Sequence, residues 1–263
     1  MNQSYIHPQA RIGKNVTIEP FSYIAANVEI GDGTWIGPHA TIMDYVKIGK
    51  NCRIYPGAVI GGEPQDYKFA GETTYVEIGD NTIIREYATV NRGTLKSGRG
   101  TTKVGSGCMI MSYSHIAHDC HIADNVVLVS YVAIAGVTDI DEYAIIGGHS
   151  AVHQFVRIGA HSMLSGGSMV GKDVPPFIIA GRRPLSFGGV NIIGLRRRGF
   201  SNEVIDQIKD IYKVIYHNGL NITDACAKVD ETFPETPEKR VIVDFIKTTK
   251  RGIIKGVVDS IDE

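Results

Sequence analysis

The sequence predicts a mainly β protein, in which a parallel β-helix is followed by a small C-terminal α-helical domain. Three observations support this fold class. An apolar residue recurs every six positions through most of residues 1–176, a glycine or another small residue often follows it, and the spacing becomes helical beyond residue 200. A six-residue period fits neither a helical turn nor the two-residue repeat of a strand. It is typical of the hexapeptide class of parallel β-helix.

The apolar hexad positions form three runs, which extend from Ile6 to Ile60, from Ile78 to Val90 and from Val104 to Val170. Each position predicts one short strand whose apolar side chain points into the interior. Three hexads make a coil of 18 residues with three flat faces, so residues 18 apart lie in one column. Coils stacked at the ordinary strand spacing form a triangular prism with backbone hydrogen bonds between them.

Two polar, glycine-containing segments interrupt the pattern, at residues 61–77 and 94–103. We expect both to be loop insertions. Loops on a rigid scaffold often carry binding residues, although a merely tolerated insertion would leave the same pattern. The hexads stop near Asp173-Val-Pro-Pro. We therefore expect the β-helix over residues 1–176, and a connecting segment with the helical domain over residues 177–263.

Three helices are expected in this C-terminal part. Ser201 is a suitable N-cap for the first helix and Gly219 a suitable stop. A second short helix is expected after Thr223, and a third at Thr236-Pro-Glu, where the cap and the first-turn proline are both favourable. The first helix presents one apolar face, made of Val204, Ile205, Ile208, Ile211, Tyr212 and Ile215. The helical domain would cap the last coil.

Composition excludes several classes of protein. The net charge of −1 gives no overall attraction to nucleic acid or to an anionic membrane. The N-terminus has no basic segment followed by an apolar one, and the most apolar stretch, residues 126–135, is too short to span a bilayer. Cys52, Cys108 and Cys120 fall on small hexad positions, which predicts buried thiols rather than disulfides or zinc ligands. A cytoplasmic protein is expected.

The densest cluster of titratable residues lies between Tyr113 and His121. His118 follows a hexad position by two residues, so we expect it at a turn, and its neighbour Asp119 could stabilise the imidazolium form. Gly136 lies one coil further along the same column, where its backbone N–H could stabilise an oxyanion. His118 is therefore a candidate general base, although a surface histidine would fit the same position.

Further polar residues extend this corner. His153 and Gln154 lie two coils beyond His118, near the same edge, with aromatic and methionine residues close to them. The arrangement predicts an elongated groove, or else a solvated edge. Arginines cluster at residues 182–183 and 196–198, which suggests a phosphate or an acidic partner, or ordinary surface charge.

Five motifs together resemble the UDP-N-acetylglucosamine O-acyltransferases, which catalyse the first step of lipid A biosynthesis. The motifs are Gln65-Asp-Tyr-Lys-Phe-Ala-Gly, His115-Ile-Ala-His-Asp-Cys, Gly148-x-x-Ala-Val-His-Gln-Phe, Asp173-Val-Pro-Pro and Gly189-Val-Asn-Ile-x-Gly-Leu-x-Arg-Arg-Gly-Phe. They cover essentially the whole chain in the family's order. Hexapeptide repeats alone would be weak evidence, because many transferases contain them.

The resemblance implies a left-handed β-helix, a homotrimer with its sites between subunits, and transfer of an (R)-3-hydroxyacyl group from acyl carrier protein to the sugar 3-hydroxyl. His118 would be the general base, Asp119 would support it, and the N–H of Gly136 would hold the oxyanion. No metal, no cofactor and no covalent acyl-enzyme are implied, because the acyl group arrives on the phosphopantetheine of the carrier protein.

The resemblance also assigns substrate-binding positions. In family order they are Gln65, Asp66, Lys68, His115, His153, Gln154, Gly166, Asn191, Arg197 and Arg198. Gly166 matches the position whose side-chain size limits acyl length, so glycine favours a longer chain. Two residues depart from the family pattern. Val137 stands where many relatives have histidine, and Ile193 stands where relatives often have glutamate.

Two other functions are compatible with part of this sequence. The related N-acyltransferase carries an additional N-terminal domain, whereas the hexads here begin at Ile6. A metal-dependent hydratase of the γ-carbonic-anhydrase type could use His115, His118, His149 and His153. The motifs leave open the acyl length and the choice between a 3-hydroxyl and a 3-amino acceptor.

Overall fold

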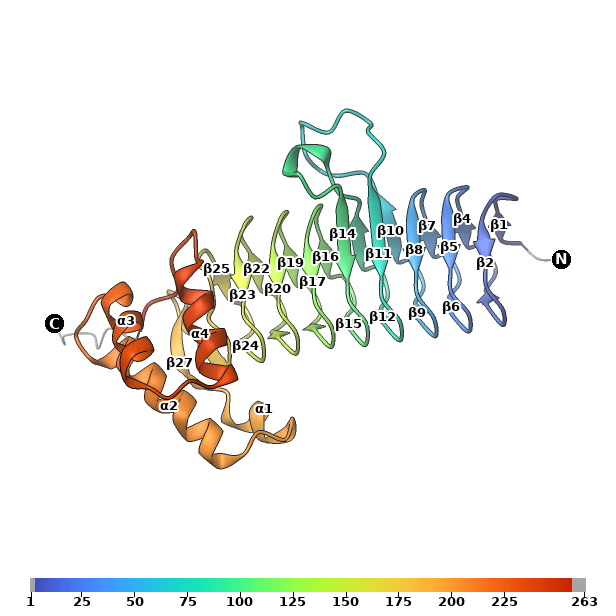
Figure 1. Cartoon of the computed structure of the whole chain (residues 1–263). Coiled ribbons are helices and arrows are strands. Elements are labelled where there is room, and N and C mark those ends of the chain that lie inside the picture. The colour runs from blue at the N-terminus through green and yellow to red at the C-terminus, as the bar shows by residue number, and fades with distance from the viewer. Residues whose placement is uncertain (1–2, 257–263) are drawn as a thin grey trace.

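The computed structural model describes residues 3–256, and Figure 1 shows a long prism of short strands with a group of helices at its C-terminal end. Each predicted apolar hexad position lies in one of the strands β1–β25. From Ile24 onward these side chains are at most 3% exposed. Ile12 in the first coil is 37% exposed, because no earlier coil covers it. The six-residue period therefore marks the side chains that fill the interior of the prism.

The strands form three sheets, one on each face of the prism, and neighbouring strands are parallel up to β26, with one register shift between β10 and β13. The first face contains β1 (Tyr5–Ile6), β4 (Tyr23–Ile24), β7 (Thr41–Ile42), β10 (Val59–Gly62), β13 (Thr89–Asn91), β16 (His115–Ile116), β19 (Ala133–Ile134), β22 (Ala151–Val152) and β25 (Met169–Val170). The second face contains β2 (Arg11–Ile12), β5 (Val28–Ile30), β8 (Val46–Ile48), β11 (Tyr75–Ile78), β14 (Thr101–Val104), β17 (His121–Ile122), β20 (Asp139–Ile140) and β23 (Arg157–Ile158).

The third face contains β3 (Thr17–Ile18), β6 (Trp35–Ile36), β9 (Arg53–Ile54), β12 (Ile83–Ile84), β15 (Met109–Ile110), β18 (Val127–Leu128), β21 (Ile145–Ile146), β24 (Met163–Leu164), β26 (Ile178–Gly181) and the antiparallel β27 (Ser186–Val190). We call the turn after the first face the first corner, the turn after the second face the second corner, and the remaining one the third corner.

The turns share a backbone conformation. The third residue after a hexad position repeatedly adopts a left-handed conformation, with φ of 53° at Asn51, 61° at Asp119 and 59° at Val137. Glycine and asparagine suit this region, whereas a β-branched residue is strained there. One left-handed residue per turn lets the chain change direction between two-residue strands.

The three faces carry different outward side chains. The second face is lined by charged residues whose sign alternates from coil to coil as far as Lys103, after which His121 interrupts the alternation; the order is Arg11, Glu29, Lys47, Glu77, Lys103, His121, Asp139 and Arg157. The third face is mostly apolar over Ile83, Met109, Val127, Ile145 and Met163. The first face carries small residues, Ala133 and Ala151, between His115 and Met169. Only the second face is therefore suited throughout to water.

Both insertions leave the prism at the first corner, and Figure 1 shows them projecting side by side near β11 and β14. The flanking strands include several residues that the sequence assigns to the insertions. β11 begins at Tyr75 and β14 at Thr101, so the excursions cover residues 63–74 and 92–100. The second excursion contains a short 3₁₀ helix, η1 (Leu95–Ser97), which Thr94 caps.

The C-terminal part contains α1 (Ile192–Arg197), α2 (Asn202–His217), α3 (Ile222–Thr232) and α4 (Pro237–Lys247). The caps expected at Ser201 and Thr236 are confirmed. The expected start of the second helix is wrong by two residues, because Asn221 rather than Thr223 is its cap. The segment expected to be a simple connection instead forms β26, β27 and α1.

Packing joins these helices to the prism. The buried hydroxyl of Tyr212 donates to the carbonyl of Pro176 at 2.6 Å, and Phe187 of β27 stacks on Tyr216 with ring centroids 4.4 Å apart. The described helices are too short and too polar for any of them to cross a membrane. The three repeat cysteines are at most 1% exposed, as predicted.

Candidate functional site

The site is built around His118 at the first corner, two residues after Ile116 of β16. Its Nδ1 lies 2.8 Å from Oδ2 of Asp119, and the histidine is 7% exposed while Asp119 is fully buried. Because a carboxylate accepts hydrogen bonds, Nδ1 carries the proton in this contact. The neutral imidazole is then left with its lone pair on Nε2, which is the arrangement of a general base.

Asp119 is held by the second excursion. Thr94 donates to its carboxylate through the backbone N–H at 3.0 Å and through Oγ1 at 2.8 Å, while Asp119 N donates to Thr102 Oγ1 at 2.7 Å. Burial alone would raise the pKa of Asp119, but the hydrogen bonds from His118 and Thr94 outweigh it and lower that pKa. The carboxylate therefore stays ionised beside the imidazole.

The first excursion brings a second carboxylate to the histidine. Asp66 Oδ2 lies 4.0 Å from His118 Nε2, and Asp66 Oδ1 accepts the backbone N–H of Lys68 at 2.9 Å. The side chains of Gln65 and Lys68 are exposed on the same loop. Nε2 therefore faces a loop that carries both signs of charge.

Gly136 lies against the imidazole, as the column of residues 18 apart predicts. A Cβ at this position would lie 2.5 Å from His118 Nε2, so only glycine fits. The next residue, Val137, donates its N–H to His118 O at 2.9 Å. Within residues 3–256 the N–H of Gly136 has no hydrogen-bond acceptor, and the residue is buried. A buried donor without a partner can accommodate an oxyanion.

His115, His153 and Gln154 lie on the same edge of the prism. His115 Nδ1 is 2.7 Å from Thr89 Oγ1, and burial, together with His118, lowers the pKa of His115. His153 is exposed and its Nδ1 lies 2.9 Å from Gln154 O. Phe155 N donates to Gly136 O, which fixes the spacing of these two coils. The hexad register placed His153 and Gln154 at this edge, and the resemblance added His115.

Gly166 lies elsewhere. It follows β24 and is exposed at the third corner, on the far side of the first face from His118. A Cβ there would meet Gly148 O at 3.1 Å, so a larger residue would crowd the preceding coil. The outward residues of the first face lie between His118 and this glycine.

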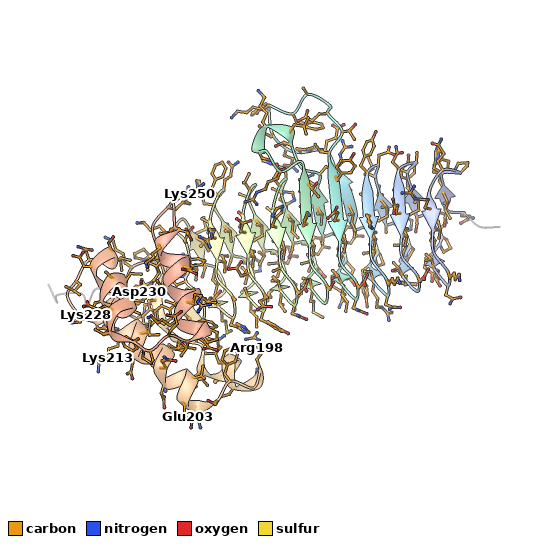
Figure 2. All side chains as sticks on the ribbon, in the orientation of Figure 1. Arg198, Glu203, Lys213, Lys228, Asp230 and Lys250 are labelled. Carbon is orange, nitrogen blue, oxygen red and sulfur yellow. The ribbon has the colours of Figure 1, made fainter. Side chains whose placement is uncertain are left out.

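Asn191, Arg197 and Arg198 lie at the second corner. Asn191 caps α1 by accepting the N–H of Gly194, and it donates to His161 O at 2.9 Å. Arg198 donates to Tyr143 O at 2.9 Å and covers the Tyr143 ring, while its buried Nη1 has no partner in the described chain. Arg197 is exposed. Figure 2 shows Arg198 on the lower edge of the prism, whereas the two excursions project from its upper edge. Within one chain, the predicted site residues therefore lie at different corners of the prism.

The histidines considered as metal ligands are separated in the same way. His149 lies at the third corner, stacked on Tyr131 with ring centroids 4.8 Å apart, while His115 and His118 contact Thr89 and Asp119. Over residues 3–256 the chain has no group of three His, Cys, Asp or Glu side chains placed to hold a metal ion.

Sequence reasoning missed Thr94, Arg99 and Asp139, which surround Asp119. Arg99 Nη1 donates to Asp119 O at 2.9 Å, and the guanidinium pairs with both carboxylate oxygens of Asp139, at 2.7 and 2.9 Å. The hexad register cannot place residues inside an insertion. The sequence offered one signal: the second insertion starts four residues after a hexad position. It therefore leaves the prism at the first corner, which carries His118 in the next coil.

Comparisons with known proteins agree with these observations. Residues 173–254 match the family model described as UDP N-acetylglucosamine O-acyltransferase, domain 2, and residues 27–62 and 101–136 match the bacterial transferase hexapeptide model. A relative from Thermodesulfovibrio yellowstonii, named acyl-[acyl-carrier-protein]–UDP-N-acetylglucosamine O-acyltransferase, is 44% identical over 250 residues, which are 95% of this chain and 96% of that protein.

A relative of the same name from a Sulfurihydrogenibium species is 48% identical over 254 residues, which cover 94% of this chain and 93% of that protein. The crystal structure of a UDP-N-acetylglucosamine acyltransferase from Bacteroides fragilis superposes with a TM-score of 0.94 at 49% identity, covering 97% of this chain and 99% of that one. The predicted fold class, a left-handed parallel β-helix with a small helical C-terminal part, is confirmed. The hydratase alternative receives no support, and the chain belongs to the UDP-N-acetylglucosamine O-acyltransferase family.

Proposed function

We propose that this chain transfers an (R)-3-hydroxyacyl group from acyl carrier protein to the 3-hydroxyl of UDP-N-acetylglucosamine, as the first step of lipid A biosynthesis in the cytoplasm. The relatives' names supply the donor and the acceptor. The observation that carries the chemistry is the buried His118–Asp119 pair, with Nε2 of the histidine beside Gly136. No resident cofactor enters the reaction, because phosphopantetheine belongs to the carrier.

In the proposed reaction the sugar hydroxyl binds beside Nε2 of His118. The imidazole takes the hydroxyl proton as the oxygen attacks the thioester carbonyl, and the ionised Asp119 stabilises the imidazolium that forms. The tetrahedral intermediate then breaks its carbon–sulfur bond. The imidazolium returns the proton to the departing thiolate, so that the enzyme is unchanged and free phosphopantetheine thiol is released on the carrier.

The oxyanion of the intermediate is assigned to the N–H of Gly136. This donor is buried, lies beside His118 and has no acceptor in the described chain. A preorganised backbone donor stabilises the charge that develops in the transition state more than the neutral carbonyl of the substrate. Asp66 and Lys68 sit on the loop facing Nε2 and would position the acceptor sugar.

The proposed active unit is a homotrimer, because the second-corner residues do not reach His118 within one chain. The charged second face suits solvent, whereas the apolar third face and the small side chains of the first face suit contact between copies. If the third face of one prism packs on the first face of the next, the second corner of one chain meets the first corner of its neighbour. Arg198 of one copy would then approach His118 of another.

The same packing gives the acyl chain a path. Ala133 and Ala151 leave space on the first face between His115 and Met169. An acyl chain whose thioester carbonyl lies beside His118 would run across these alanines toward Gly166 at the third corner. A glycine at that end leaves room for a long acyl group.

A turnover assay with a series of (R)-3-hydroxyacyl carrier proteins, run with 3-hydroxyl and 3-amino acceptors, tests the proposal. We expect transfer to the 3-hydroxyl acceptor and a preference for long chains. His118→Ala should lower kcat by about 10²–10⁴-fold without changing the circular dichroism spectrum, because only the proton acceptor is lost. His7→Ala, in the first coil of the same corner, is the matched control and should retain wild-type turnover.

Full turnover in His118→Ala would contradict the general-base role. Lack of transfer to either acceptor by the wild-type protein would contradict the proposed reaction itself.

A further inference from the structure

Arg99 reaches from the second excursion to two aspartates on different coils. Its Nη1 donates both to the backbone carbonyl of Asp119 and to Oδ1 of Asp139, while Nη2 donates to Oδ2 of Asp139 at 2.9 Å. The two side chains are only 25% and 32% exposed. A bidentate, partly buried pair of this kind is stronger and more directional than an ordinary surface ion pair.

The contact differs from its neighbours on the second face. Lys103 and Glu77 also pair between adjacent coils, at 3.3 Å, but their side chains are 52% and 51% exposed. Within residues 3–256 neither side chain is hydrogen-bonded to His118 or Asp119. Arg99 instead connects the excursion to β20 and, through the Asp119 carbonyl, to the residue beside His118. Within residues 3–256 that carbonyl accepts no other hydrogen bond.

Asp119 lies at a turn with a left-handed φ of 61°, and its backbone N–H and C=O bond to side chains rather than to a neighbouring strand. Every polar group of Asp119 is held by the same stretch of chain or by His118. The N–H is held by Thr102, the carboxylate by Thr94, and the carbonyl by Arg99. If the excursion loosens, the carboxylate loses donors and its orientation toward His118 changes.

We propose that the Arg99–Asp139 pair is a positioning device for the proposed reaction, which clamps the second excursion over Asp119 and thereby fixes the orientation of the His118–Asp119 pair. Arg99 acts through Asp119 and does not touch substrate. This role rests on the proposed function of His118. It uses two residues that none of the motifs resembling the family contains.

Arg99→Ala tests the clamp through steady-state kinetics. We expect kcat to fall about 10-fold while KM for both substrates stays within about 2-fold, because a misoriented base affects the transition state more than binding. Asp139→Ala should give a fall of equal or smaller size, because Arg99 can still donate to Asp119 O. The double variant should be no slower than Arg99→Ala, since Arg99→Ala already removes the ion pair. Lys103→Ala, the matched control, should retain wild-type kcat.

A second readout separates the clamp from general loss of stability. Loss of the clamp weakens the Thr94 hydrogen bonds to Asp119 and changes the position of the carboxylate relative to the imidazole. In histidine-labelled Arg99→Ala at constant pH, the ring-nitrogen chemical shifts of His118 should therefore change. Lys103→Ala should leave them unchanged.

Three results would overturn the clamp: an unchanged kcat and unchanged His118 chemical shifts in Arg99→Ala, a rise in KM alone, or additive losses in the double variant. The proposed function is tested separately. If His118→Ala remains fully active, the general-base role is wrong, whereas the His118 chemical shifts of Arg99→Ala still decide whether Arg99 orients the pair.

Discussion

Val137 and Asp119 occupy equivalent turn positions on consecutive coils, and both have left-handed backbones. For Asp119 this conformation is compatible with the side chain and is supported by hydrogen bonds from the excursion. For Val137 the β-branched side chain crowds the backbone, and the cost of such a conformation is of order 1–2 kcal/mol. Asparagine is used at this position in other coils, as at Asn51, Asn81 and Asn125. Val137 therefore not only departs from the family pattern but also strains the backbone beside the site.

Val137→Asn should stabilise the protein by about 1 kcal/mol per chain and raise Tm by about 2–4 °C, because asparagine tolerates the left-handed conformation. Differential scanning calorimetry measures the change. Val241→Asn is the control, since Val241 is exposed in the regular helix α4 and the same substitution should not raise Tm there. An unchanged or lower Tm for Val137→Asn would show that the turn is not strained.

His118, Asp119 and Gly136 could be predicted at this scale because they lie in the hexad register, which fixes both corner and column. Thr94 and Arg99 could not, because an insertion has no register and its side chains are placed by tertiary contacts. Tertiary contacts also bring Asp66 to within 4.0 Å of His118. The sequence identified the first excursion as a loop but could not show where it folds back.

At the scale of elements, the seam between the prism and α1 centres on His161. Its ring stacks between Tyr143 and Phe177, at 5.1 and 5.6 Å, and meets the edge of Phe200. The residue is 7% exposed and its Nδ1 has no partner in the described chain. Burial, and secondarily the charge of Arg198, lowers the pKa of His161 to about 4.

This seam predicts a specific loss of stability in acid. The folded pKa of His161, about 4, lies below its ordinary value of 6.5, so the unfolded chain takes up a proton first as pH falls. The stabilising contribution is complete above the unfolded pKa and declines from pH 6.5 toward 4. Between pH 7 and 5 we expect a loss of about 1–2 kcal/mol per chain from this residue.

His161→Phe keeps the aromatic stack and removes the titrating group, so its Tm should fall less than that of the wild type between pH 7 and pH 5. His39→Phe is the control, because His39 is also stacked on an aromatic ring, Phe21, but is exposed. Its pH dependence should match the wild type. Parallel Tm curves for wild type and His161→Phe would contradict the assignment.

Elements with a clear period or cap were predictable, whereas β26, β27 and α1 were not. β26 and β27 lack the six-residue spacing and pair as a hairpin on the third face. α1 has only six residues and is defined by its Asn191 cap and its packing against the second corner. Their positions follow from covering the last coil, which is a tertiary requirement.

The whole molecule is asymmetric around its long axis, with one charged face and two faces of apolar or small side chains. This asymmetry underlies the proposed trimer. Light scattering should give a mass three times the 28.6 kDa of one chain. Ile145→Asp places a charge on the third face and should shift the mass toward one chain and abolish turnover, because the site would lose its second-corner residues.

Lys47→Ala on the charged second face is the matched control and should leave both mass and turnover unchanged. A wild-type mass of a single chain would contradict the trimer. So would an Ile145→Asp protein that keeps the trimeric mass and full turnover, since the third face would then not be the contact.

The fixed register of the prism has a consequence for how such a chain can change length. One extra residue within a strand would turn the apolar side chain of that strand outward, whereas extra residues at a corner leave the interior untouched. Both excursions obey this restriction, and both use the corner that His118 occupies. His118, Gly136 and Gln154 are therefore separated from one another by whole coils of the prism. Duplication or loss of a complete coil before residue 59 would move the N-terminus by one strand spacing and leave both excursions and the reacting groups where they are.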